Sequence, residues 1–286
     1  MRPCRLIING DDFGASEEIN EAIILAHRNG ILTSTSLMVS GPAFEHAVNL
    51  AKENPLLAVG LHVTLVAGSA VLPSSQIPHM ATQNGTFPPD PALAALRYFF
   101  SLGAREEISK EITAQFKKFS QTGLHFSHVD SHCHMHVNPV VLNAIVKIAE
   151  DFRIKRIRVP ADDFFAALPF LKSPFAAGYA LVFKLLTARM KKMLVGKGFI
   201  FPGRVYGNMM TGAMNLEYVL SVLDRLPEGA TEIYFHPLLP SCASIQDTGR
   251  LQQFRELCIL LDSKAQAKIR RLGIIPSTYF DLEKDA

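Results

Sequence analysis

Two consecutive aspartates, Asp11 and Asp12, lie between glycines directly after the apolar run 6–8. Adjacent carboxylates repel each other, and a buried carboxylate must be paired, hydrogen-bonded or bound to a metal. We therefore expect a cation beside this pair. The alternative is an Asx-rich turn that only caps a helix beginning near Ser16, and the histidines further along the chain weigh against it.

Histidines that could share this cation follow two later apolar runs. His62 lies near the end of the run 56–63. A second group alternates along the chain: Asp130, His132, His134 and His136. Residues two apart face the same side of an extended chain, so we predict that these four side chains project together.

An aspartate and two histidines with open coordination positions are a common ligand set for a catalytic divalent metal. The second carboxylate of the pair would then act as a base on water, and a histidine from another strand would protonate the leaving group. An arginine beside the base would keep it ionised. These residues predict metal-assisted hydrolysis of an amide or an ester.

The elements expected around these residues alternate between strands and helices. Apolar and β-branched runs predict strands over 4–9, 33–39, 56–63, 156–159, 232–235 and 274–280. Apolar periodicity and capping residues predict helices over 16–29, 42–53, 105–120, 140–150, 216–226 and 249–262. Between them, 67–90 is expected to be a long irregular loop on the same side as His62.

The candidate residues share one position, at or just beyond the carboxyl end of an expected strand. They are Asp11, Asp12, His62, His132, Arg158 and His236. This face carries the active site of a (β/α) barrel. We therefore predict one α/β domain over residues 1–286, folded as a single distorted (β/α) barrel with seven or eight parallel strands.

Composition narrows the class of protein. A net charge of +3 without a dense basic run argues against nucleic acid as a partner. The four cysteines are scattered without Cys-x-x-Cys spacing, which fits a reducing compartment. No apolar stretch reaches the roughly 18 residues of a transmembrane helix, and no signal peptide is evident. We expect a cytoplasmic protein.

The segment 162–200 differs from the rest because it is rich in Phe and Leu, with Lys and Arg threaded through it. We predict an apolar helical insertion here. It either packs on the barrel or forms an amphipathic flap over a membrane surface or a lipid substrate.

Four segments resemble the YdjC-like carbohydrate deacetylases, which belong with the wider polysaccharide-deacetylase (NodB) group. They are Gly-Asp-Asp-Phe-Gly at 10–14, Gly-Ile-Leu-Thr-Ser-Thr-Ser-Leu-Met-Val at 30–39, Val-Gly-Leu-His at 59–62 and His-Val-Asp-Ser-His-Cys-His-Met-His at 128–136. The resemblance covers most of the chain and is weakest over about 162–215. It implies a NodB/YdjC-like barrel that removes an N-acetyl group from an amino sugar with one divalent metal.

Within that resemblance, the implied metal ligands are Asp12, His62 and His132. The family uses magnesium or zinc-like metals, and two histidines favour zinc or another transition metal because magnesium prefers oxygen ligands.

The remaining roles follow from the same resemblance. Asp11 is the implied general base, Arg158 the arginine that steadies it, and His236 the general acid. We assign the neighbours of the ligand positions to substrate binding: Asp130, His134 and His136.

Three further segments are similar to the hopanoid-biosynthesis branch of the family (HpnK). They are Arg97-Tyr98-Phe99-Phe100-Ser101, the run 111–116 and Thr122-Gly123-Leu124. This similarity implies the N-acetylglucosaminyl head group of a hopanoid as substrate and peripheral contact of 164–200 with the inner face of a membrane. Because relatives often pair, it also implies a homodimer.

Three alternatives stay open. The first is a deacetylase of soluble chitooligosaccharides such as diacetylchitobiose. The second is a metal-dependent phosphoesterase, for which the strand ends carry few carboxylates. The third is a carbohydrate-binding relative without activity, which would have no need of the base, acid and ligand residues.

Overall fold

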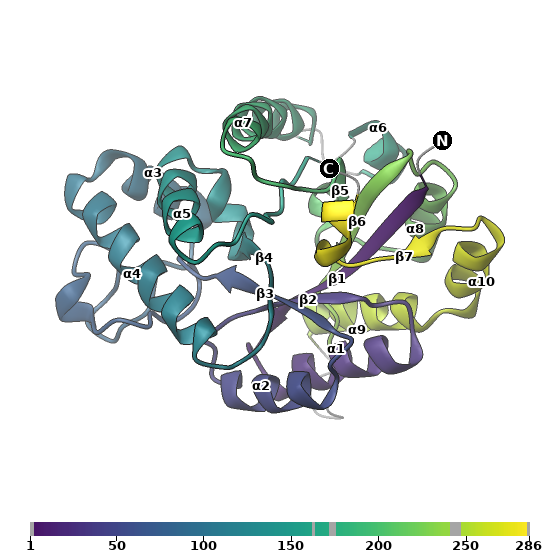
Figure 1. The fold of residues 1–286 in the computed structure, drawn as a ribbon, viewed down its shortest axis with the longest axis horizontal. Coiled ribbons are helices and arrows are strands. Elements are labelled where there is room, and N and C mark those ends of the chain that lie inside the picture. The colour runs from purple at the N-terminus through teal and green to yellow at the C-terminus, as the bar shows by residue number, and fades with distance from the viewer. Residues whose placement is uncertain (1–2, 162–163, 172–175, 241–246, 285–286) are drawn as a thin grey trace.

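The computed structural model describes residues 3–161, 164–171, 176–240 and 247–284, and Figure 1 shows their arrangement. Within these residues, one seven-stranded sheet has the order β4-β3-β2-β1-β6-β5, and β7 pairs with β1. All pairs of strands in this sheet are parallel. The strands are β1 (Cys4–Phe13), β2 (Ser34–Leu37), β3 (Ala58–Val63), β4 (Phe126–Ser131), β5 (Arg204–Tyr206), β6 (Gly229–Phe235) and β7 (Ile275–Pro276).

Helices surround this curled sheet (Figure 1). The α-helices are α1 (Glu17–Asn29), α2 (Phe44–Glu53), α3 (Pro91–Phe100), α4 (Leu102–Ser120), α5 (Pro139–Asp151), α6 (Phe164–Ala167), α7 (Ala176–Gly196), α8 (Leu216–Leu223), α9 (Thr248–Leu261) and α10 (Ser263–Arg271). Short 3₁₀ helices are η1 (Ser74–Gln76), η2 (His132–Val137), η3 (Leu168–Phe170), η4 (Asn208–Met210) and η5 (Tyr279–Lys284). One apolar core of buried residues runs from Leu6 to Ile274.

Local sequence explains why the elements begin where they do. The Ser16 hydroxyl accepts a hydrogen bond from the Ile19 amide and caps α1. Asn138 caps α5 through the Val140 amide, and Pro139 occupies the first helical position, where no amide donor is needed. Both helices therefore start just after a strand or turn that carries candidate residues.

The predicted parallel α/β fold is confirmed, in the form of a curled half-barrel. Its edge strands β4 and β5 do not pair with each other. Between them lie isolated bridges, Val129 with Ile157 and Arg156 with Ile200. The strand predicted over 156–159 is thus reduced to two bridges.

Two other predictions are wrong. The strand predicted over 274–280 pairs only at Ile275–Pro276, and η5 begins at Tyr279. The extended conformation predicted over 130–136 ends at Ser131, because Cys133 and His134 have positive φ angles of 50° and 52° and the chain turns into η2. The elements α3, α10 and β5 were not predicted, and β4 was anticipated only where it overlaps the extended run at Asp130 and Ser131.

Candidate metal centre

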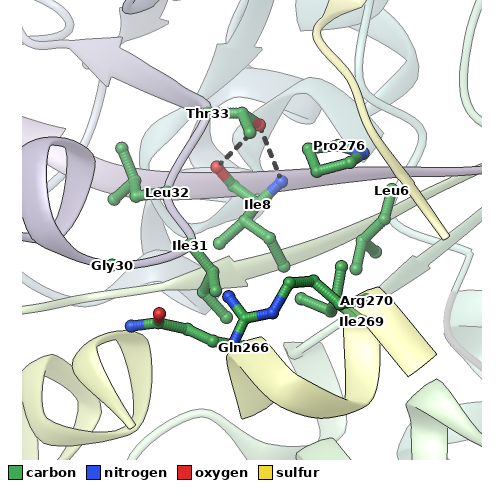
Figure 2. Close-up of a pocket in the computed structure, with 10 residues that line it drawn as sticks. All are labelled: Leu6, Ile8, Gly30, Ile31, Leu32, Thr33, Gln266, Ile269, Arg270 and Pro276. Carbon is green, nitrogen blue, oxygen red and sulfur yellow. Dashed lines mark hydrogen bonds between the residues drawn. The ribbon is translucent and has the colours of Figure 1, made fainter. Parts of the chain in front are cut away.

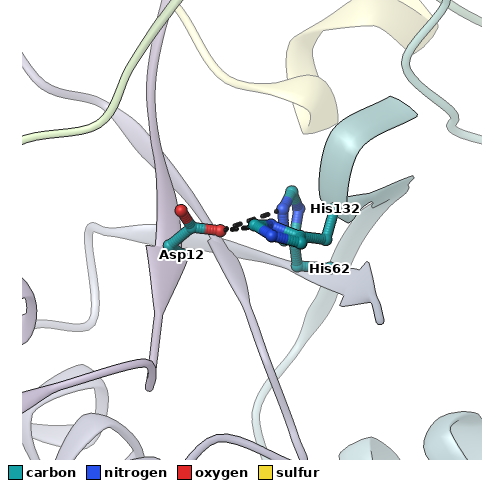
Figure 3. A group of neighbouring side chains, drawn as sticks. All are labelled: Asp12, His62 and His132. Carbon is teal, nitrogen blue, oxygen red and sulfur yellow. Dashed lines mark hydrogen bonds and ion pairs between the residues drawn. The ribbon is translucent and has the colours of Figure 1, made fainter. Parts of the chain in front are cut away.

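Asp12, His62 and His132 come from three strand ends and converge on one point (Figure 3). The Nδ1 atom of His132 lies 2.9 Å from Asp12 Oδ1, and the Nε2 atom of His62 lies 3.3 Å from the same oxygen. One ligand atom from each residue lies within 4.8 Å of the others. The geometry therefore brings together the three residues expected to bind a metal.

A bulge in β1 allows two consecutive aspartates to serve one site. Successive side chains of a regular strand point to opposite faces. The register of β1 against β2 shifts between Gly10 and Phe13, and Asp12 has a left-handed φ of 66°. Aspartate tolerates this conformation better than most residues. The bulge re-aims the Asp12 side chain, as bulges beside active sites commonly do.

A second carboxylate orients the His62 ring. The Nδ1 atom of His62 lies 2.8 Å from Asp130 Oδ1, so its Nε2 atom faces Asp12. A histidine that binds a metal commonly donates its other N–H to a carboxylate in this manner. Asp130 also accepts a hydrogen bond from Ser36 Oγ at 2.9 Å. In the neutral ring, these contacts favour the tautomer with its proton on Nδ1, which leaves Nε2 to bind a metal.

Arg158 joins three buried carboxylates beneath this group. Its Nη1 and Nη2 atoms each lie 2.7 Å from one oxygen of Asp11. Nη1 also lies 2.7 Å from Asp130 Oδ2, and Nη2 lies 2.7 Å from Glu232 Oε1. Arg158 has no exposed surface. A buried charge of this kind is stable only when it is paired and hydrogen-bonded, and here it is both.

The pKa shifts follow from these contacts. Burial alone would lower the pKa of His62, but Asp130 and Asp12 raise it to about 10. Burial also opposes the charged form of His132, and Asp12 raises its pKa to about 11. Burial would raise the pKa of Asp12, yet the two histidines hold it well below its ordinary value. These shifts favour a negatively charged Asp12 with positive charge on the side of His62 and His132.

These donors fit a divalent transition metal. A second group, Asp11, His62 and Asp130, also has one possible ligand atom per residue within 4.8 Å of the others. Its two carboxylates already receive positive charge from Arg158, whereas Asp12 meets only the two histidines among the described contacts. The donors of Asp12, His62 and His132 are therefore the group better suited to hold a metal.

His236 lies one strand away from this group. Gly10 pairs with Phe235, so Asp11 and His236 follow at matching positions on β1 and β6. The His236 amide donates a hydrogen bond of 2.6 Å to Glu256 Oε2, and its Nδ1 atom lies 4.0 Å from that oxygen. Its side chain is 23% exposed. The structure thus places the expected acid beside the expected base and partly open to solvent.

The three residues assigned to substrate binding lie in different surroundings. Asp130 and His136 are fully buried. His136 lies 2.5 Å from Ser131 Oγ and 3.1 Å from the Arg158 carbonyl oxygen. These partners favour a positioning role over substrate contact for both residues. His134 is half-buried, and its Nε2 atom lies 2.9 Å from the Tyr234 hydroxyl.

Several supporting residues were not predicted. Glu232 accepts hydrogen bonds from Arg158 and from the Tyr279 hydroxyl, and burial raises its pKa despite these partners. Asn9 donates to Asp11 Oδ1 at 2.8 Å and to Ser36 at 2.9 Å. Glu232 could have been identified from the sequence, because it lies inside the apolar run 230–235 and a buried carboxylate needs a partner.

Two hollows lie outside this group. One, of about 210 Å³, lies where the first half of β1 meets α10 (Figure 2). Its lining contains one charged residue, Arg270, and no metal ligand. The other, of about 710 Å³, lies between α6, α7 and β5 and has mostly apolar walls. Phe183 lines this second cavity, and its ring centroid is 6.3 Å from that of His134.

The chain is similar to several known proteins. The sequence profile of the YdjC-like protein family matches residues 5–271. A carbohydrate deacetylase of Geobacillus stearothermophilus is 31% identical over 285 residues, or 99% of each chain. One of Brevibacillus brevis is 42% identical over 158 residues, which span 54% of this chain and 59% of that relative.

A solved structure shows the same fold over almost the whole chain. It is a crystal structure from Enterococcus faecalis V583, described as a candidate cellobiose-phosphate cleavage protein. It is 25% identical, with a TM-score of 0.79 that covers 98% of this chain and 99% of that one.

Proposed function

This chain belongs to the YdjC-like protein family, and we propose that it is a metal-dependent carbohydrate deacetylase that hydrolyses the N-acetyl group of an amino sugar. The observation that carries the proposal is the convergence of Asp12, His62 and His132 beside a second, arginine-bound carboxylate, Asp11. The match with the Geobacillus carbohydrate deacetylase, which spans 99% of both chains, supports the same reaction.

Asp12, His62 and His132 would hold one divalent metal. Two imidazoles and one carboxylate favour zinc or another transition metal over magnesium. When bound, such a metal polarises the acetyl carbonyl and lowers the pKa of water. Asp130 keeps the His62 ring in the orientation that this ligand set requires.

Asp11 acts as the general base. Asn9 and Arg158 occupy three of its roughly four acceptor positions among the described residues, which leaves Oδ2 able to take a proton from the attacking water. The same contacts fix the carboxylate in one orientation, so no rearrangement is needed during the reaction. The water oxygen bonds to the acetyl carbon while its proton passes to Asp11.

His236 acts as the general acid. It lies across from Asp11 on the neighbouring strand, and Glu256 holds its backbone amide. When the carbon–nitrogen bond breaks, the His236 ring donates a proton to the sugar nitrogen. The products are acetate and the free amino sugar.

For the substrate, we propose the N-acetylglucosaminyl head group of a hopanoid, with 164–200 as a peripheral contact at the inner face of the membrane. The cavity of about 710 Å³ supports this choice, because its apolar walls suit a lipid and Phe183 connects it to His134 in η2. Within this segment, 162–163 and 172–175 lie outside the described residues. A homodimer stays part of the proposal.

The competing substrate is a soluble chitooligosaccharide. The test is mass spectrometry of the purified protein incubated with N-acetylglucosaminyl hopanoid in detergent, with diacetylchitobiose run in parallel and a chelator added to matched samples. Loss of one acetyl group from the lipid alone supports the hopanoid substrate, and loss from the sugar alone replaces it. Turnover that the chelator leaves unchanged, or no turnover by metal-loaded protein on either substrate, would contradict the proposal.

A further inference from the structure

Helix α3 leaves an apolar face uncovered. Leu93, Leu96 and Phe100 are exposed, and their spacing of three and four residues places them on one side of the helix. Phe100 is 71% exposed. Ala94 and Tyr98, on the other side, are fully buried. Monomeric proteins rarely gather exposed apolar side chains in this way without a binding role.

Helix α7 presents a similar face that continues into basic residues toward its carboxyl end. Val182 is exposed and Leu185 is 65% exposed, one turn apart along the helix. Arg189 and Lys192 follow at the next turns and are also exposed. An interfacial helix has this pattern, in which apolar side chains enter the lipid boundary and cations remain among the head groups.

The two faces flank the segment that carries His132. Both α3 and α7 contact η2 and α5, and Figure 1 shows α3, α5 and α7 along one side of the molecule. We call the exposed residues of α3 (Leu93, Leu96 and Phe100) and of α7 (Val182, Leu185, Arg189 and Lys192) the basic apolar face. The two helices that carry this face therefore contact the segment that begins with His132.

Charge is distributed unevenly along the chain. Residues 164–216 contain seven lysines and arginines and no aspartate or glutamate. A second copy of the chain docked symmetrically on α7 would bring like charges together, which disfavours that contact. An anionic surface is the complementary partner.

We propose that the basic apolar face docks on the head-group layer of an anionic lipid bilayer. The proposal extends the glycolipid substrate suggested above, and it adds α3 as a second contact and negative lipid charge as the recognised feature. The contact is peripheral: among the helices in the described part of the chain, none has the length and apolarity that crossing a bilayer requires. Each basic residue near such a surface strengthens binding by roughly fivefold.

The test is co-sedimentation of the full chain with extruded vesicles. One set contains phosphatidylcholine alone, and the other contains phosphatidylcholine with phosphatidylglycerol. We expect at least about tenfold stronger partitioning to the anionic set. Because this readout needs no turnover, failure of docking and failure of the deacetylase proposal are separate results.

Three double variants dissect the face. Leu96→Ser with Phe100→Ser alters α3, Val182→Ser with Leu185→Ser alters the apolar part of α7, and Arg189→Gln with Lys192→Gln removes charge. We expect the charge variant to lose roughly 30-fold in partitioning to anionic vesicles, and each apolar variant to lose binding to both sets. The matched control is Leu56→Ser, because Leu56 is 84% exposed and lies outside the face.

Three outcomes would overturn the proposal. Equal binding of the wild type to both vesicle sets would remove recognition of lipid charge. Unchanged binding of the α3 variant would remove α3 from the surface. A dimer in light scattering that the α3 variant dissociates, together with no wild-type protein in the vesicle pellet, would assign the face to a second copy of the chain.

Discussion

The charged residues of the network around Arg158 are buried and paired, whereas those of the basic apolar face are exposed to solvent. In the network, Arg158 has no exposed surface and contacts Asp11, Asp130 and Glu232. On the face, cations and apolar side chains are exposed together. A buried charge is tolerated only while its partners remain, whereas an exposed one contributes little to folding. Substitutions in the network should therefore change catalysis and stability, and substitutions on the face should change only binding.

The largest difference between the two regions is expected in turnover. Asp11→Asn removes the general base and should reduce kcat by about 10²–10⁴-fold, while metal content stays near one ion per chain because Asp12, His62 and His132 remain. Leu185→Ser on the face should leave kcat on detergent-dispersed N-acetylglucosaminyl hopanoid unchanged, because a substrate in detergent does not require docking on a bilayer. Steady-state kinetics and elemental analysis of both variants measure this, and a near-normal rate for Asp11→Asn would remove Asp11 as the base.

The free energy of unfolding should also fall much more when a cation is lost from the network than when one is lost from the face. Arg158→Met leaves three carboxylates buried without their cation and should lower the free energy of unfolding by about 3–5 kcal/mol. Lys192→Met, the matched loss of a cation on the face, should change it by less than about 0.5 kcal/mol. Urea denaturation of both variants gives the comparison. Similar losses in the two would mean that the network is not held together by Arg158.

Metal affinity should fall more when a ligand is removed than when a residue that only positions a ligand is changed. Asp130→Asn weakens the hold on the His62 ring and should reduce affinity by about 10–100-fold. His62→Ala removes a ligand and should leave the protein without metal after dialysis. Competition with a chromophoric chelator measures the first variant. Full metal occupancy in His62→Ala would exclude His62 from the ligand set.

A further expected effect is a dependence of stability on pH that comes from two buried histidines, His128, whose Nε2 atom lies 3.2 Å from Ser36 Oγ, and His136. Burial lowers the pKa of His128 to about 3 and of His136 to about 4. Both are neutral in the folded protein, but the unfolded chain binds their protons below about pH 6.5. Each histidine should therefore reduce the free energy of unfolding by about 1.4 kcal/mol per pH unit as pH falls from 6.5 toward 4.

A series of urea denaturations between pH 7 and pH 4.5 tests this effect. His128→Gln should make the loss of stability on acidification less steep, and Leu185→Ser should leave it unchanged. An equally steep loss in His128→Gln would mean that His128 is charged in the folded protein or exposed to solvent.

The elements around the ligands were predictable because their local signals are strong. Continuous apolar runs end at Asp11 and His62, and capping residues mark α1 and α5. The short or featureless elements were missed: β5 has three residues, and α3 reads Pro-Ala-Leu-Ala-Ala-Leu-Arg-Tyr-Phe-Phe, which is too uniformly apolar to show a period. Of the strand predicted over 274–280 only Ile275–Pro276 pairs, and the chain turns into η5 at Tyr279, whose hydroxyl donates to Glu232.

The site residues were likewise predicted where the local sequence signal is strong and missed where long-range contacts place them. Asp12, His62 and His132 were identified together because each stands out in type at a strand end, and the structure brings them together. The partners beneath them depend on contacts between distant segments, such as Arg158 with Asp11, 147 positions apart in the chain. Asp130 was assigned to substrate binding as a neighbour of a ligand position, and its contacts with His62 and Arg158 join segments far apart in the chain.

The uneven charge of residues 164–216 also affects how the protein travels before any contact forms. This segment holds seven of the 29 basic residues and none of the 26 acidic ones, so the remainder carries 22 basic residues against 26 acidic ones. The segment that contains α7 therefore carries a formal charge of +7 and the rest of the chain −4, so the molecule has a charge dipole. An oppositely charged surface turns such a dipole during diffusion, so most encounters begin with α7 leading. Salt shortens the reach of this steering to about 8 Å at physiological ionic strength.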